Sequence, residues 1–139
     1  MTCIVCSAVA AKRLSYSAAL EAWDKPRILD ALADDVVLYV AVHDAPMHGK
    51  DVADFLFGVL QEELGEITIT DEIIEGGSAV VLLETSIGDM RAQGLNVIRL
   101  DASSLIRELT VFFRPLAALS QIAEVVGARM AERFGPPPE

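Results

Sequence analysis

The length, composition and charge of the chain limit what it can be. A chain of 139 residues is one domain by length, large enough to bury a core without disulfides or metals. Its net charge of −10 and pI of about 4.5 disfavour nucleic acid and anionic membranes as partners, because both attract basic surfaces. Hydrophobic residues make up 53% of the chain, yet no uncharged apolar run approaches the ~20 residues of a membrane span. We therefore expect the apolar excess to lie in a subunit interface and in an internal cavity.

The two ends of the chain are set apart from its middle. Residues 1–13 are expected to form an arm, residues 14–134 a single domain and residues 135–139 a proline-rich tail. The arm carries a Cys-x-x-Cys pair, Cys3 and Cys6, which is either redox-active or half of a zinc site. Zinc needs two more ligands, and the chain has only two histidines. We expect reduced thiols in a cytoplasmic protein, with no metal and no cofactor.

The first half of the domain alternates short helical and apolar segments. Leu14–Trp23 predicts a short helix, and Asp24 caps a second one, which ends at the aspartates 34–35. Val36–Val42 is a continuous apolar run with β-branched residues, typical of a strand buried on both faces. After a loop, His48–Leu64 predicts an amphipathic helix. Its apolar stripe consists of Val52, Phe55, Leu56, Val59, Leu60 and Leu64.

The second half of the domain has the pattern of a β-meander closed by a helix. Short glycine- and aspartate-containing turns separate four strand-like runs and favour antiparallel hairpins. These runs are Ile67–Ile74, Ala79–Ile87, Arg91–Leu100 and Leu105–Arg114. Pro115 then begins a terminal helix, whose apolar stripe consists of Leu116, Leu119, Ile122, Val126 and Met130. The pattern predicts an α+β domain with helices laid against a curved sheet.

This order of elements resembles the SnoaL-like branch of the nuclear transport factor two-like superfamily. Three segments carry the likeness: Ala31–Val37 (ALADDVV) as the acidic turn into the first strand, Met47–Leu56 (MHGKDVADFL) as the start of the long helix, and Leu105–Leu116 as the last strand. The resemblance implies a cone, in which a curved mixed or antiparallel sheet wraps around N-terminal helices, with a C-terminal helix and a pocket inside. Members include polyketide cyclases, ketosteroid isomerases and limonene epoxide hydrolases, so the fold alone does not settle the function.

The resemblance also implies acidic residues on the inner face of the sheet, and the chain departs from that pattern. The last strand places Val111, with Leu109 and Phe113 on the same face, where the epoxide hydrolases carry an aspartate. The arginine–aspartate pair of the middle strand falls near Glu84, and of the polar pair on the first strand only Tyr39 has a match. We therefore do not expect limonene-type epoxide hydrolysis, which needs an acid and a base on either side of a water.

Glu84 is the acid with the clearest catalytic interpretation. It shares one face of an apolar strand with Leu82, and a carboxylate on such a face is costly unless it is paired or neutral. Glu84 is therefore either a pocket base tuned by burial, or a strand-end residue that meets solvent or pairs with Arg91 or Arg99 across the hairpin.

A second polar cluster precedes the long helix. His43, Asp44 and His48 lie within six residues of one another. They are either an acid–base pair at the pocket mouth, two metal ligands, or a polar loop in which His48 caps the helix. No third metal ligand is indicated, so the polar loop is the more frequent outcome for such a pattern.

The apolar residues of the expected pocket are also candidates for plain core. Those that we expect to contact a ligand are Trp23, Tyr39, Phe55, Val59, Leu82, Met90, Leu109, Val111 and Phe113. Two polar residues on the third meander strand, Gln93 and Asn96, either orient a ligand carbonyl or face water.

Three functional hypotheses follow. The first is a homodimer, paired through the outer sheet face, that binds a small apolar molecule without the usual catalytic carboxylates. The second is a cofactor-free isomerase, cyclase or hydrolase that uses Glu84, or His43 and Asp44, as acid and base. The third is a protein-interaction domain whose pocket is vestigial.

Overall fold

The computed structural model describes residues 14–42 and 44–135. The expected order of helices and strands is confirmed. The elements are α2 Ser15–Glu21, α3 Lys25–Asp30, β1 Leu32–Tyr39, β2 Met47–His48, α4 Lys50–Glu63, β3 Thr68–Glu75, β4 Ser78–Ile87, β5 Met90–Leu100, β6 Ile106–Arg114 and α5 Leu116–Phe134. None of the helices in these two ranges is long and apolar enough to cross a membrane.

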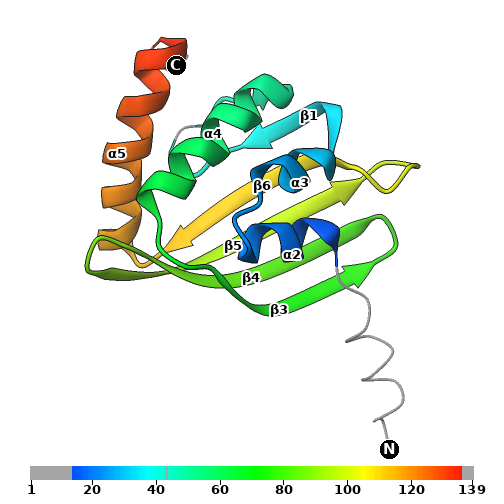
Figure 1. The fold of residues 1–139 in the computed structure, drawn as a ribbon, viewed down its shortest axis with the longest axis horizontal. Coiled ribbons are helices and arrows are strands. Elements are labelled where there is room, and N and C mark those ends of the chain that lie inside the picture. Colours follow the sequence, from blue (N-terminus) through cyan, green and yellow to red (C-terminus); the bar gives the residue numbers. More distant parts are fainter. Residues whose placement is uncertain (1–13, 43, 136–139) are drawn as a thin grey trace, which may run out of the picture.

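The sheet is a single six-stranded layer that forms the back of the molecule in Figure 1. Its strand order is β2-β1-β6-β5-β4-β3, and only the pairing of β1 with β6 is parallel. Helices α2, α3 and α4 lie against one face, and α5 stands across one end of the sheet beside α4 (Figure 1). The expected α+β architecture, a curved mixed sheet with N-terminal helices on one side and a C-terminal helix, is confirmed.

Alternation along the strands decides which face is buried. On β4 the residues at 79, 81, 83, 85 and 87 are buried, and their neighbours are only half-buried. On β6, Leu109 is fully buried, and Val111 and Phe113 pack against the same core cluster. The inward orientation of these three residues, expected from the last-strand match, is therefore confirmed. The opposite face of the sheet, called the outer face below, carries no helix from the described ranges (Figure 1).

The first strand differs from its prediction in both extent and burial. It begins at Leu32 and includes the two aspartates at 34–35, because its start pairs in parallel with Ile106 through an irregular register. It is not buried on both faces, since Tyr39 points to the uncovered outer face and is 37% exposed. A continuous apolar run therefore does not require cover on both faces of a strand. It also occurs where the second face of the sheet is an exposed apolar surface.

Two helix ends also differ from the sequence pattern. The long helix is preceded by Gly49 at φ 95°, so His48 is not its N-cap and instead pairs with Val37 in the short strand β2. Leu116, expected in the buried stripe of the last helix, is 77% exposed. The buried stripe begins instead at Ala118 and continues through Ile122, Val126 and Met130, so Leu116 lies off its face.

Candidate functional site

A buried polar pair lies in the interior between the helices and the sheet. The Tyr16 hydroxyl on α2 donates a hydrogen bond to Oδ1 of Asn96 on β5, over 2.6 Å. Both side chains are almost fully buried, at 2% and 3% exposure. Tyr16 reaches the sheet because its helix lies flat against it, and its ring makes an edge contact with Phe57 of α4 at a centroid distance of 6.3 Å. The pair is thus held from two elements that are far apart in the sequence.

A small apolar cavity adjoins this pair. It has a volume of about 30 Å³, enough for a water molecule or two but far below the ~300–1,000 Å³ of a typical ligand pocket. Apart from Tyr16 and Asn96 its walls are apolar, and they include Trp23, Phe57, Val111 and Phe113. In the described part of the chain only Tyr16 bonds to the Asn96 amide. Among the described residues, no protein atom accepts a hydrogen bond from the Nδ2 of this amide.

Burial controls the protonation of Tyr16. Desolvation raises the pKa of its hydroxyl above the ordinary value, because the phenolate would lose its hydration. The hydroxyl therefore stays a hydrogen-bond donor throughout the physiological pH range.

This shift predicts a loss of stability at high pH. The pKa of Tyr16 is higher in the folded chain than in the unfolded one. Its contribution to the free energy of unfolding is therefore complete below about pH 10 and is lost as the pH rises further. We expect the free energy of unfolding to fall by about 1.4 kcal/mol per pH unit from this group alone. Urea unfolding between about pH 9 and pH 11 measures it, with Tyr16→Phe as the reference. Equal pH slopes for the two proteins would contradict the prediction.

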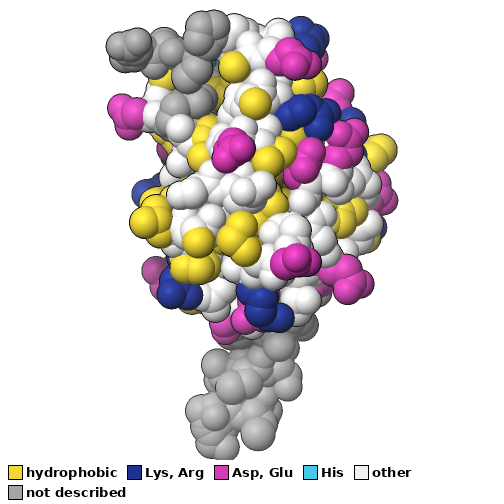
Figure 2. Space-filling view, turned by 90° about the vertical axis from the view of Figure 1, so that its left-hand side faces the viewer, with side chains coloured by type: hydrophobic (Ala, Val, Ile, Leu, Met, Phe, Trp, Pro, Cys, Tyr) yellow, Lys and Arg dark blue, Asp and Glu magenta, His cyan; other side chains and the backbone are white. Residues whose placement is uncertain are grey.

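A larger recess lies at the end of the sheet, next to the interior cavity. It has a volume of about 450 Å³ and is bounded by the last residues of β1, the loop after it, β6 and the first turns of α5. Val111 and Phe113 line both the recess and the cavity, so their side chains form the wall between the two. Gly94 leaves room for this wall, since a Cβ there would lie 3.0 Å from the Phe113 ring. Hydrophobic side chains gather at the surface of this end of the molecule, between scattered charged ones (Figure 2).

Trp23 closes the interior on its helical side. It follows α2 with φ at 51°, a left-handed conformation that suits glycine and is an outlier for a bulky residue. The conformation ends the helix, because the Asp24 N–H returns to the Ala19 carbonyl at 2.9 Å. It also aims the indole at the cavity, where Nε1 donates to the Gly65 carbonyl at 3.3 Å. A strained backbone thus holds an aromatic side chain over the cavity.

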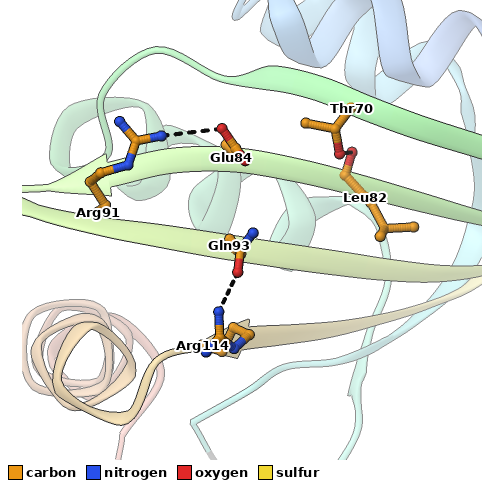
Figure 3. A network of polar contacts seen from close by, with 6 residues as sticks. All are labelled: Thr70, Leu82, Glu84, Arg91, Gln93 and Arg114. Carbon is orange, nitrogen blue, oxygen red and sulfur yellow. Dashed lines mark hydrogen bonds and ion pairs between the residues drawn. The ribbon is translucent and has the colours of Figure 1, made fainter.

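Glu84 lies outside this interior. It sits on the outer face of β4, and its carboxylate accepts a hydrogen bond from Arg91 across the hairpin at 3.2 Å (Figure 3). Leu82 shares this face, so the alternation of β4 removes both residues from the expected inner pocket. Gln93 belongs to the outer face too and contacts Arg114 of β6 (Figure 3). The cross-hairpin pairing that the sequence allowed for Glu84 is the one the structure shows.

The other predicted site residues lie in several separate parts of the structure. Asp44 and Tyr39 line the recess, whereas His43 lies outside the described residues. Phe55 and Val59 line a different hollow, between α4 and α5, which shares no lining residue with the interior cavity. Met90 packs against the edge of the core. The structure thus brings together Trp23, Val111 and Phe113 around the cavity, and Tyr39 joins the last two in the recess. The remaining predicted ligand contacts do not line the cavity.

Sequence reasoning missed Tyr16 altogether. Its position on the same short helix as the core residues Ala19 and Leu20 was visible, but a single tyrosine on an apolar helix face carries no chemical signal by itself. The polar partner on the third meander strand was noticed, and only the fold shows that Asn96 faces inward while Gln93 faces outward. In residues 14–42 and 44–135, no group of three or more histidine, cysteine or acidic side chains is placed to hold a metal ion.

Comparisons with known proteins identify the fold. No protein-family model matches the chain, and no curated protein sequence matches it either. Solved structures do match. An uncharacterised bacterial protein with a cystatin-like fold from Silicibacter pomeroyi is 21% identical, with a TM-score of 0.76 over 84% of this chain and 85% of that one.

Two further structures are similar. A steroid delta-isomerase from Pseudomonas aeruginosa is 20% identical, with a TM-score of 0.77 over 92% of this chain and 93% of that one. A hypothetical protein with a ketosteroid isomerase-like fold from Catenulispora acidiphila, in complex with trimethylamine, is 13% identical, with a TM-score of 0.61 over 80% and 90%. The chain therefore has the cystatin-like fold that the resemblance implied.

Proposed function

We propose that the protein binds a small, mostly apolar molecule that carries a hydrogen-bond acceptor such as a ketone oxygen. The single observation that supports this is the buried pair of Tyr16 and Asn96 in an otherwise apolar cavity. Buried polar groups normally use their full hydrogen-bonding capacity. A ligand oxygen that enters the cavity would accept a hydrogen bond from the amide Nδ2 of Asn96, whose Oδ1 already accepts from the Tyr16 hydroxyl.

Binding requires the wall between recess and cavity to move. The recess, at about 450 Å³, has the volume of a ligand pocket, whereas the cavity at about 30 Å³ does not. The bulk of the ligand would therefore occupy the recess, and its oxygen would reach Asn96 after Phe113 changes rotamer. Side chains change rotamer on binding more readily than backbones move. The steroid delta-isomerase among the structural neighbours supports the ligand class, since a steroid is small and mostly apolar.

A matched pair of probes tests this function. 2-Acetylnaphthalene carries a ketone, and 2-ethylnaphthalene has the same shape without one. We expect the ketone to bind roughly tenfold more tightly, because the Asn96 amide is left without an acceptor in the hydrocarbon complex. Trp23 is the only tryptophan of the chain and lines the cavity, so its fluorescence reports both titrations.

Two variants of one strand provide the control. Asn96→Leu should abolish the preference for the ketone, while Gln93→Leu, on the outer face of the same strand, should leave it unchanged. A preference that survives both Asn96→Leu and Tyr16→Phe would contradict the proposal. Failure of both probes to bind at millimolar concentration would favour the third hypothesis, a protein-interaction domain with a vestigial pocket.

An acid–base activity at the same place is the second candidate. Asp44 lines the recess beside Val111 and Phe113, and its carboxylate would remove a proton from the carbon next to the ketone while the Asn96 amide, held in place by Tyr16, donates to the enolate oxygen. The proton then returns to carbon from the same carboxyl group. In D₂O such an enzyme would exchange the methyl protons of 2-acetylnaphthalene, and Asp44→Asn would not. Exchange at the uncatalysed rate with wild-type protein would remove this candidate.

We also propose that this pocket protein is a homodimer that pairs through the outer face of the sheet. Five large hydrophobic side chains are exposed in the described ranges, and three of them, Tyr39, Ile73 and Phe112, lie on that face. Exposed apolar surface of this kind marks an interaction site.

A further inference from the structure

The inner face of β5 has a gap in its row of side chains directly beside Asn96. Ala92, Gly94 and Asn96 alternate along this face and are all buried. Gly94 has no positive φ, so glycine is not needed there for its backbone conformation. A glycine inside a strand often marks a place where another group approaches closely. We therefore examined which groups occupy the space above Gly94.

Two side chains from the neighbouring strands meet in that space. A Cβ on Gly94 would lie 2.9 Å from Cδ1 of Leu83 and 3.0 Å from Cε1 of Phe113. Both residues stand opposite Gly94, Leu83 on β4 and Phe113 on β6. Any side chain larger than hydrogen at position 94 would therefore displace them.

This filled space adjoins the buried amide. Gly94 and Asn96 follow one another on the same face of β5, and same-face residues of a strand are ~6.8 Å apart. Leu83, Phe113 and Asn96 all line the interior cavity. The Phe113 ring thus occupies the position next to the amide along the sheet.

Of the two side chains above Gly94, Phe113 is the one that can leave. Leu83 is 4% exposed and belongs to the buried core. Phe113 is only half-buried and borders the recess of about 450 Å³. Rotation of its ring into the recess would empty a ring-sized space, with the Gly94 backbone as its floor and the Asn96 amide at its end.

We infer that the Phe113 ring fills the place of the ligand's own ring, and that Gly94 makes the site selective for a flat ring attached directly to the ketone. This inference rests on the proposed function. Of the ~6.8 Å between neighbouring same-face positions, a hydrogen bond to Asn96 takes up about 2.9 Å, which leaves about 4 Å from ring centre to oxygen. A carbonyl group bonded to the ring has this reach, whereas a carbonyl at the end of a flexible chain would extend past Asn96.

Two variants test the position of the ring. Phe113→Ala removes the rotamer change that must precede binding, so it should raise the affinity for 2-acetylnaphthalene about tenfold. Adding Gly94→Ala to this variant places a methyl group on the floor of the emptied space. We expect the second change to lower the affinity again by at least about tenfold. The titrations follow Trp23 fluorescence, because Trp23 lines the cavity.

A matched substitution and a matched ligand serve as controls. Gly127→Ala makes the same change in α5, where a Cβ would meet nothing within 4 Å, and should leave the affinity unchanged. 1-Acetyladamantane is a globular ketone with the same number of carbons as 2-acetylnaphthalene. It should bind the wild-type protein at least about tenfold more weakly, because it does not fit a space left by a flat ring. Circular dichroism melts establish that each variant is folded.

Failure of this inference can be distinguished from failure of the proposed function. A wild-type protein that binds neither naphthalene probe would overturn both. A preference for the ketone that Asn96→Leu abolishes, with no effect of Gly94→Ala in the Phe113→Ala protein, would keep the function and overturn the position over Gly94. Equal affinity of the wild-type protein for the flat and the globular ketone would overturn the selectivity, and this outcome needs no variant to fold.

Discussion

Replacing Leu109 with alanine is expected to lower the free energy of unfolding by about 3 kcal/mol, within the roughly 2–5 kcal/mol range of buried leucines. Leu109 is 0% exposed at the centre of β6, with paired strands on both sides through Leu38 and Ile98. The sheet cannot collapse around the missing side chain without disturbing both neighbours. Most of the lost volume should therefore remain as a cavity, which adds its own cost to the lost transfer free energy.

A leucine at a contrasting position serves as the control. Leu116→Ala makes the same chemical change where the side chain is 77% exposed, and we expect a change within about 0.5 kcal/mol. Urea unfolding followed by circular dichroism gives both values, at one protein concentration because a dimer makes stability concentration-dependent. Similar losses for the two variants would mean that β6 does not present Leu109 to the core.

The buried pair of Tyr16 and Asn96 should show strong coupling in stability. Tyr16→Phe leaves the amide, and Asn96→Leu leaves the hydroxyl, without its partner in an apolar interior. An unsatisfied buried group costs about 1–3 kcal/mol, so each single change should lower the free energy of unfolding by that amount. The double variant replaces both polar groups with apolar ones of similar size, and its loss should be clearly smaller than the sum of the two.

A double-mutant cycle measures this coupling. The four proteins are unfolded in urea at neutral pH, and the coupling energy is the deviation of the double variant from additivity. Gln93→Leu combined with Tyr16→Phe serves as the control cycle, because Gln93 lies on the other face of β5. Additive losses in the Tyr16–Asn96 cycle would show that the hydrogen bond does not stabilise the folded chain.

Periodicity in the sequence was sufficient for the order of elements. The long helix and the four meander runs have strong apolar periods, since one face of each must leave water as the chain folds. The inward orientation of Leu109, Val111 and Phe113 was expected from the resemblance of the last strand to the SnoaL-like family. Alternation along a strand, however, shows only that its two faces differ, and not which of them is buried. The sequence therefore left two interpretations of Glu84 open, a pocket base and a cross-hairpin pair, because β4 has apolar residues on both parities.

Other features depend on where distant segments meet. The hydrogen bond between Tyr16 and Asn96 joins residues 80 positions apart, and no local pattern encodes such a contact. The first strand is half-exposed because no described helix covers the outer face, a property of the whole layer arrangement. The sequence by itself thus determined the elements and their apolar sides, through local periodicity. The tertiary structure alone decided which polar groups lie together in the interior, because that depends on packing between elements that the chain brings together only when it folds.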